Sequence, residues 1–167
     1  ELDPLEPIGR EPGAAERGTA IHQALHEFCL AHCSTLPNDA VSILENIALK
    51  AFEPISHLPE FAAFWWPRFQ RAAHWFISWE RKRRNPGTLI KVEETGRLVV
   101  KLPGGGDFTL SARADRIEIA PDKSFVIIDY KTGRVPGINE ARIGFSPQLT
   151  LEASMVKRGA FANIEAT

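Results

Sequence analysis

Three polar residues in the second half of the chain have the types and spacing needed to hydrolyse a phosphate ester. Asp129 and Lys131 follow the apolar run 125–128, and side chains two residues apart on a strand project to the same side. Asp115 lies in the preceding run, and antiparallel pairing would bring its carboxylate beside that of Asp129. Because adjacent carboxylates repel unless a cation or proton lies between them, the pattern predicts a Mg²⁺ or Mn²⁺ site. Lys131 would orient or deprotonate an attacking water, or neutralise charge that develops on the phosphate.

Two other interpretations of the residues that could do chemistry stay open. An Asp-x-Lys sequence also arises where a strand edge carries an ordinary ion pair. His22, His26, Cys29 and Cys33 follow one another at spacings of four, three and four in a helical pattern, which suggests a zinc site. One straight helix cannot wrap four ligands around an ion, although an i, i+4 pair could supply two of them. The two cysteines share one helix face, so a disulfide framework is excluded.

The elements that must position these residues include four expected helices. Helical periodicity and end signals predict them over about 14–31, 39–52, 67–84 and 146–158. Asn38 or Asp39 is expected to cap the second helix, and Pro67 suits the first turn of the third. The third helix ends in a basic cluster. A solvated helix end that complements the helix dipole is the simpler interpretation of this cluster, and nucleic-acid binding is the alternative.

After the helices, the apolar pattern changes to that of strands. Four are predicted, over 89–94, 97–102, 108–119 and 125–131. Their connections are short, so an antiparallel meander is expected, with a turn at Thr95-Gly96. Apolar positions change from even to odd numbers along the third strand, which predicts a bulge or sharp bend between residues 111 and 116. The last strand is apolar on both faces at 125–128, as expected of a strand buried at the centre of a sheet.

Length and composition limit the class of protein. The 167 residues, 44% hydrophobic and 25% charged, fit one globular domain over 14–167 after an extended lead-in at 1–13, as a fragment of a longer chain. The net charge of −1 argues against general attraction to a polyanion, although the segment 68–84 is locally basic. No apolar run approaches the roughly 20 residues of a membrane-spanning helix, and no signal peptide is recognisable. A cytoplasmic protein without membrane attachment is therefore expected.

Four short motifs resemble, in order and spacing, the nuclease domain of the PD-(D/E)XK superfamily in its RecB and AddB branch. The motifs are Arg17-Gly18-Thr19-Ala20-Ile21-His22, Asp115-Arg116-Ile117-Glu118, Asp129-Tyr130-Lys131-Thr132-Gly133 and Gln148-Leu149-Thr150-Leu151. Together they cover most of the chain from residue 17 to about 158. The resemblance implies an α/β (α+β) fold with a restriction-endonuclease-like core. In such a fold a mixed, mostly antiparallel β-sheet is flanked by helices, here with an N-terminal helical portion over 14–85 and the sheet and closing helix over 88–158.

The resemblance also implies a role for each matching residue. His22, Asp115 and Asp129 would be ligands of Mg²⁺ or Mn²⁺, with the backbone carbonyl of Tyr130 completing the metal's shell. Lys131 would be the catalytic lysine. Gln148 would help to hold the DNA or the site. The other residues expected on the substrate side are Gly18, Arg113 and Thr132.

The implied activity is that of a metal-dependent DNA exonuclease acting on a single strand or a duplex end. It would be the nuclease module of an AddB-type subunit, partnered by a helicase subunit or domain of an AddAB-like complex in double-strand break repair. The alternatives are a stand-alone Cas4-like single-strand exonuclease, or an idle DNA-binding or scaffold module of the same fold. No cysteine follows Cys33, so the chain cannot build a four-cysteine iron–sulfur cluster. Two departures from the family pattern are Ala112 and Glu152, and Glu93 and Glu94 are expected at a solvated strand edge.

Overall fold

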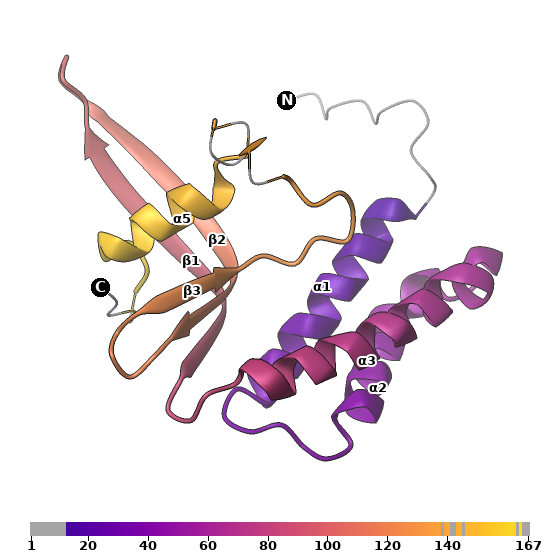
Figure 1. Cartoon of the computed structure of the whole chain (residues 1–167). Helices are drawn as coiled ribbons and strands as arrows, with labels where there is room; N and C mark the ends of the chain where they lie inside the picture. Colours follow the sequence, from indigo (N-terminus) through magenta and orange to yellow (C-terminus); the bar gives the residue numbers. More distant parts are fainter. Residues whose placement is uncertain (1–12, 138, 141–142, 145, 163, 165–167) are drawn as a thin grey trace. The chain divides into compact units, whose positions relative to one another are not determined.

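The chain folds as two compact units in the computed structural model, which describes residues 13–137, 139–140, 143–144, 146–162 and 164 (Figure 1). The helical unit contains the described residues up to Phe28 together with Asn38–Trp79. The sheet unit contains Cys29–Pro37 and the described residues from Glu80 onward. Apart from Gly13, the expected lead-in lies outside the described residues. That residues 14–167 form a single domain stays a prediction.

All four expected helices are present in the structure. They are α1 (Ala14–Ala31), α2 (Ala40–Ala51), α3 (Trp66–Arg83) and α5 (Gln148–Lys157). Asp39 occupies the N-cap position of α2, as expected, but its side chain makes no capping hydrogen bond. A 3₁₀ turn at Glu53–Ile55 and a π-helical turn at Phe61–Trp65 precede α3. The third helical segment therefore begins before Pro67, which lies at the second residue of α3.

Aromatic and small apolar side chains form the core of the helical unit. Phe28 of α1 meets Phe76 of α3 edge to face, with ring centroids 6.3 Å apart. Phe52, at the end of α2, packs against Phe69 with centroids 5.6 Å apart. Leu44 is fully buried on the inner face of α2. The apolar spacing of the three sequences thus becomes one buried stripe on each helix. No helix in the described part of the chain is both long enough and apolar enough to cross a lipid bilayer.

The sheet unit contains a three-stranded antiparallel meander in the order β1-β2-β3 (Figure 1). The strands are β1 (Leu89–Lys101), β2 (Asp107–Ile119) and β3 (Phe125–Ile128). The meander was expected, but the turn at Thr95-Gly96 was wrong, because β1 continues through it and pairs Thr95 with Arg113. The central position of the strand over 125–128 was also wrong. Among the described strands β2 is central and β3 is at the edge, with Val126 48% exposed.

The predicted irregularity near residues 111–116 has a different form from a bulge. β1 and β2 keep one register from Leu89↔Ile119 to Lys101↔Asp107, so no extra residue is inserted in either strand. The distortion lies on the facing strand at Glu93, whose φ of 55° is in the left-handed region. The change of apolar parity in β2 has another cause: Ala114, Arg116 and Glu118 are buried as well as Ile117 and Ile119, so both faces of its second half are covered.

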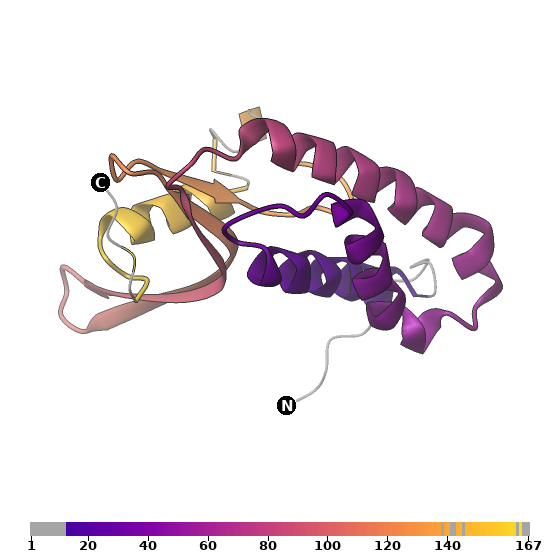
Figure 2. The same cartoon turned by 90° about the horizontal axis from the view of Figure 1, so that it is seen from below.

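Helix α5 packs on the sheet and closes the core of the sheet unit (Figures 1 and 2). Met155 and Val156 of α5 are buried with Ile117 of β2 and with Phe161, which follows the helix. Phe161 also forms an isolated antiparallel bridge to Gly96 of β1. These contacts hold α5 beside the strand ends that carry the sequence-predicted acids.

Gly96 is required by the close approach of Phe161. A Cβ atom at this position would lie 2.8 Å from two ring carbons of Phe161. We expect Gly96→Ala to lower the free energy of unfolding by about 1–3 kcal/mol, because the ring must move within a packed core. Urea denaturation measures the change. Gly104→Ala is the matched control, since nothing lies within 4 Å of its added Cβ. Equal stability of the two variants would contradict the prediction.

Candidate active site

Two carboxylates lie where the hydrogen-bonded ladder between β2 and β3 ends: Asp115 within β2, and Asp129 directly after β3. The ladder between these strands ends at the pair Arg116↔Ile128, and Asp115 and Asp129 are the next residues beyond it. The backbone N–H of Tyr130 donates a hydrogen bond to Asp115 Oδ2, with a distance of 2.8 Å. The end of β3 is thereby tied to the acid of β2. The antiparallel register, which the sequence predicts, is what places the two acids together.

Lys131 and Gln148 extend this pair of acids into a connected group. Lys131 Nζ lies 2.8 Å from Asp129 Oδ2. Gln148, the first residue of α5, donates from Nε2 to Asp129 Oδ1 at 2.8 Å and accepts from Lys131 Nζ at Oε1 at 3.1 Å. The side chain of Asp129 is 8% exposed and that of Lys131 is 37% exposed. The group is therefore anchored inside the protein and presents its ammonium to solvent.

A third carboxylate joins the group from α5. Glu152 is 3% exposed, and its Oε1 accepts a hydrogen bond from Gln148 Nε2 at 3.2 Å. Burial raises the pKa of the Glu152 carboxyl, and the negative charges of Asp129 and Asp115 raise it further. The sequence interpretation noted Glu152 only as a departure from a family pattern. The available signal was its position four residues after Gln148, which on a helix places both side chains on one face.

The donor set at the strand ends suits a hard divalent cation. Asp115 and Asp129 offer carboxylate oxygens, and Mg²⁺ is commonly held through one or two carboxylates with water in its remaining positions. Within the described ranges, no three His, Cys, Asp or Glu side chains converge closely enough to hold a metal ion. That Asp115, Asp129, His22 and the backbone carbonyl of Tyr130 hold such a cation stays a prediction. The zinc site suggested by the spacing of His22, His26, Cys29 and Cys33 gains no support.

The other sequence-predicted residues are spread over both units. His22 and Gly18 lie on α1 in the helical unit, both half-buried, and their participation in the site stays a prediction. Arg113 is an exposed residue of β2 that forms an ion pair with Glu93. Thr132 is exposed just after Lys131. Glu93 is half-buried, so its surroundings are less solvated than the sequence suggested.

Comparison with known proteins identifies the family. The model of the PD-(D/E)XK nuclease superfamily matches residues 2–166. The chain belongs to this superfamily. Similar sequences include an uncharacterized protein of Rickettsia bellii, 29% identical over 96% of this chain, and uncharacterized proteins of Rickettsia conorii and Rickettsia felis, each 30% identical over 92% of it. The chain spans about a fifth of the length of these relatives: 19% of the first two and 18% of the third.

A buried ion network supports the strand ends of this PD-(D/E)XK protein. Arg116 is fully buried and donates to both carboxylate oxygens of Glu80, at 2.7 and 3.1 Å. Its Nη2 also lies 2.5 Å from Glu118 Oε1, and its Nη1 donates to the hydroxyl of Tyr130 at 3.2 Å. Burial alone would lower the pKa of Arg116, but the Glu80 hydrogen bonds and neighbouring groups raise it above its usual value. The ring of Tyr130 is thus held by the network while its backbone N–H holds Asp115.

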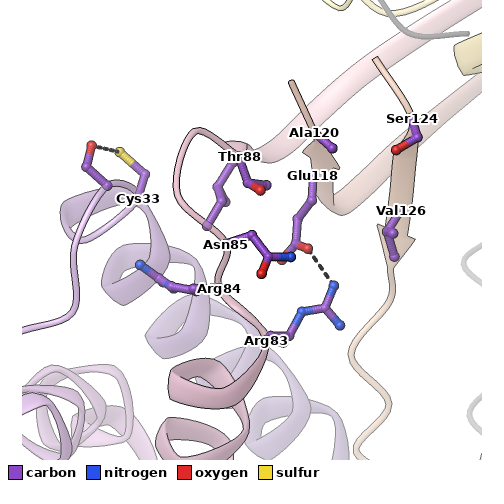
Figure 3. Close-up of a pocket in the computed structure, with 11 residues that line it drawn as sticks. Cys33, Arg83, Arg84, Asn85, Thr88, Glu118, Ala120, Ser124 and Val126 are labelled. Atoms are coloured by element: carbon purple, nitrogen blue, oxygen red, sulfur yellow. Dashed lines mark hydrogen bonds and ion pairs between the residues drawn. The ribbon is translucent and has the colours of Figure 1, made fainter. Parts of the chain in front are cut away.

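The basic cluster at the end of α3 takes part in the same network. Arg84 pairs with Glu80 at 2.6 Å, and Arg83 pairs with Glu118 at 2.5 Å. A pocket of ≈ 220 Å³ opens beside Arg83, Arg84 and Glu118, and Figure 3 shows the Arg83–Glu118 pair at its wall. Asp115, Asp129, Lys131 and Gln148 are not among the residues that line this pocket. Two members of the basic cluster therefore serve internal ion pairs, and the pocket is separate from the Asp115–Asp129 group.

The two cysteine thiols differ in burial and therefore in expected reactivity. Cys29 is fully buried, and burial raises the pKa of its thiol, whereas Cys33 is half-buried. Because the thiolate is the reactive form, we expect a disulfide reagent at neutral pH to modify Cys33 at least about tenfold faster than Cys29. Mass spectrometry of timed samples measures both rates. Denaturant should make the rates converge, and rapid labelling of Cys29 in the folded protein would contradict this prediction.

Proposed function

We propose that this chain is a metal-dependent deoxyribonuclease domain that hydrolyses phosphodiester bonds. The observation that carries the proposal is the group formed by Asp115, Asp129 and Lys131 where the ladder between β2 and β3 ends. In a member of the PD-(D/E)XK nuclease superfamily, this is the combination of acids and amine that phosphodiester hydrolysis uses. DNA is the substrate that the superfamily name indicates.

Each residue of the group has a distinct part in the proposed reaction. Asp115 and Asp129 would hold the divalent cation, which would supply charge neutralisation at the phosphate and polarise the attacking water. Lys131 places an ammonium beside Asp129, where it stabilises negative charge on the phosphate oxygens as the water oxygen bonds to phosphorus and the P–O bond to the leaving oxygen breaks. The Gln148 carboxamide holds the side chains of Asp129 and Lys131 in place relative to each other. The backbone carbonyl of Tyr130 and the imidazole of His22 complete the proposed ligand set.

The finer assignment rests on the sequence resemblance. We propose an exonuclease module of an AddB-type helicase–nuclease, acting in the cytoplasm on a DNA single strand or duplex end in double-strand break repair. A helicase subunit or domain of an AddAB-like complex would deliver the strand, which is compatible with a net charge of −1 on the chain. Gly18, Arg113 and Thr132 would face the DNA backbone near the site.

Two other functions are tested by the same experiments. A Cas4-like exonuclease would degrade a single strand without any motor partner. An idle module of the same fold would bind DNA without cleaving it, and the Asp129–Lys131 contact would then be an ordinary ion pair. The complete set of acids and amine at the strand ends favours an active enzyme over this last alternative.

A gel assay with end-labelled single- and double-stranded DNA tests the proposal. We expect cleavage with Mn²⁺ or Mg²⁺ and none with EDTA, because removal of the cation leaves two carboxylates that repel the phosphate. Labels at the 5′ and 3′ ends distinguish exonuclease from endonuclease products. Calorimetry with Mn²⁺ provides a second measurement, in which Asp129→Asn should weaken binding. Intact DNA under all metal conditions, in the chain alone and joined to its helicase partner, would refute the nuclease proposal.

A further inference from the structure

Glu152 is a buried carboxylate that no assigned role requires. It lies on the inner face of α5, one turn before the buried Val156, and only 3% of its surface is exposed. Its Oε1 receives one hydrogen bond, from Gln148, while its buried Oε2 has no hydrogen-bond partner among the described residues. A buried acid with half of its acceptors unused reduces stability relative to an apolar side chain of the same size. Packing alone therefore does not explain an acid at this position.

The partner of Glu152 is the carboxamide that connects the two reactive side chains. Gln148 Nε2 donates to both Asp129 Oδ1 and Glu152 Oε1, and Gln148 Oε1 accepts from Lys131 Nζ. A carboxamide has one donor end and one acceptor end. A flip would direct its oxygen at two carboxylates and its NH₂ at an ammonium, so the observed arrangement has a single favourable orientation.

Gln148 Nε2 donates to two carboxylates, and only that of Glu152 takes no direct part in the proposed reaction. Asp129 Oδ1 is shared with Lys131 Nζ at 3.0 Å, and this carboxylate is the one proposed to hold the metal and to face phosphate. When Asp129 and Lys131 engage substrate, their contacts with Gln148 change. The contact between Gln148 and Glu152 lies behind them on α5 and stays in place, because the two residues are four apart on one helix face.

We propose that Glu152 is a positioning residue of the nuclease site, which fixes the Gln148 carboxamide so that its oxygen holds Lys131 Nζ beside Asp129. The proposal rests on the proposed function and adds a residue to it. Glu152 acts as a hydrogen-bond acceptor rather than as a charge, so glutamine can replace it and leucine cannot. The pKa of Glu152 is raised by burial, which is consistent with an acid whose burial lowers the stability of the fold.

Four variants and a control separate positioning from packing. Glu152→Leu removes the acceptor but fills the same volume with an apolar group. We expect it to raise Tm by about 3 °C, since a desolvated carboxylate is lost, and to lower kcat about tenfold with KM unchanged.

Glu152→Gln keeps an acceptor and should retain activity within about twofold. Gln148→Leu combined with Glu152→Leu should be no slower than Gln148→Leu alone, because the two residues act as one unit. Lys157→Ala, in the exposed last turn of α5, is the control for general effects on the helix.

An activity-independent measurement makes failure of this inference distinguishable from failure of the nuclease proposal. In ¹⁵N spectra, the side-chain NH₂ protons of Gln148 should exchange slowly in the wild type and in Glu152→Gln, and rapidly in Glu152→Leu. If the wild type has this protection but no cleavage occurs, the nuclease proposal fails and the positioning geometry stands. Unchanged protection in Glu152→Leu overturns the positioning role. Equal losses of activity in Glu152→Gln and Glu152→Leu also overturn it, since the carboxylate charge itself would then be required.

Discussion

Replacing Lys131 with methionine is expected to lower the DNA cleavage rate by about 10²–10³-fold, the range found when one donor that stabilises a developing anion is removed. The Lys131 ammonium is held 2.8 Å from Asp129 and 3.1 Å from Gln148, so it is fixed before the phosphate arrives. Methionine keeps most of the side-chain length and lacks the charge. Because Lys131 is 37% exposed, its ion pair contributes little to stability, and the variant should fold normally by circular dichroism.

Lys101→Met is the matched control for this variant. Lys101 lies at the far end of β1, 81% exposed and paired with Asp107, and its replacement makes the same change in charge and volume. Single-turnover cleavage of a labelled oligonucleotide with Mn²⁺ compares the two variants with the wild type. Cleavage that persists at the wild-type rate in Lys131→Met would show that Lys131 is not part of the reaction, or that a contaminating nuclease is present; adding Asp129→Asn distinguishes these two causes.

The helices were predictable because their sequences contain both the period and the end signals. In α1 and α2 the apolar spacing gave boundaries within one or two residues of those observed. The π-helical turn at Phe61–Trp65 was not predictable from spacing. It depends on how five consecutive aromatic or small apolar side chains pack, which is decided by tertiary contacts rather than by local preference.

The strands show where local signals mislead. Thr95-Gly96 has the letters of a turn, yet Gly96 is in the middle of β1 because Phe161, sixty-five residues later, occupies the space above it. A glycine within a strand indicates either a turn or a close approach, and only the fold distinguishes the two. Likewise, the apolar run at 125–128 predicted a central strand, whereas among the described strands β3 lies at the edge, with three half-buried residues and an exposed Val126.

The adjacency of the two acids was predictable because antiparallel pairing determines which residues of two strands face each other. Antiparallel pairing across a short turn can bring Asp115 beside Asp129, and the observed register, which ends at Arg116↔Ile128, does so. Glu152 and the Arg116 network were not predictable in this way. The burial of Glu152 depends on how α5 packs on the sheet, and the Arg116 network joins β2 to the ends of α1 and α3. Both therefore require the packing of helices whose positions the sequence does not specify.

Arg116→Leu is expected to lower the free energy of unfolding by about 3–5 kcal/mol, the usual penalty for removing one partner of a buried ion pair. The side chains of Arg116 and Glu80 are both fully buried. In the variant, Glu80 would keep Arg84 as an ion-pair partner but lose Arg116, and the Tyr130 hydroxyl would lose its Arg116 donor. Arg113→Leu is the matched control. Arg113 is on the same strand but is 69% exposed, so its pair with Glu93 should contribute less than about 1 kcal/mol.

Chemical denaturation of Arg116→Leu and Arg113→Leu measures both losses, and replacing Arg116 together with Glu80 by leucine and methionine tests their cause. If the penalty comes from an uncompensated buried carboxylate, the double variant should recover most of the stability that Arg116→Leu loses, because the acid no longer needs a partner. If the loss comes from the shape of the Arg116 site, the double variant should be at least as unstable. Equal stability of Arg116→Leu and Arg113→Leu would mean that the network does not hold the strand ends. The positioning of Asp115 through Tyr130 would then need another source.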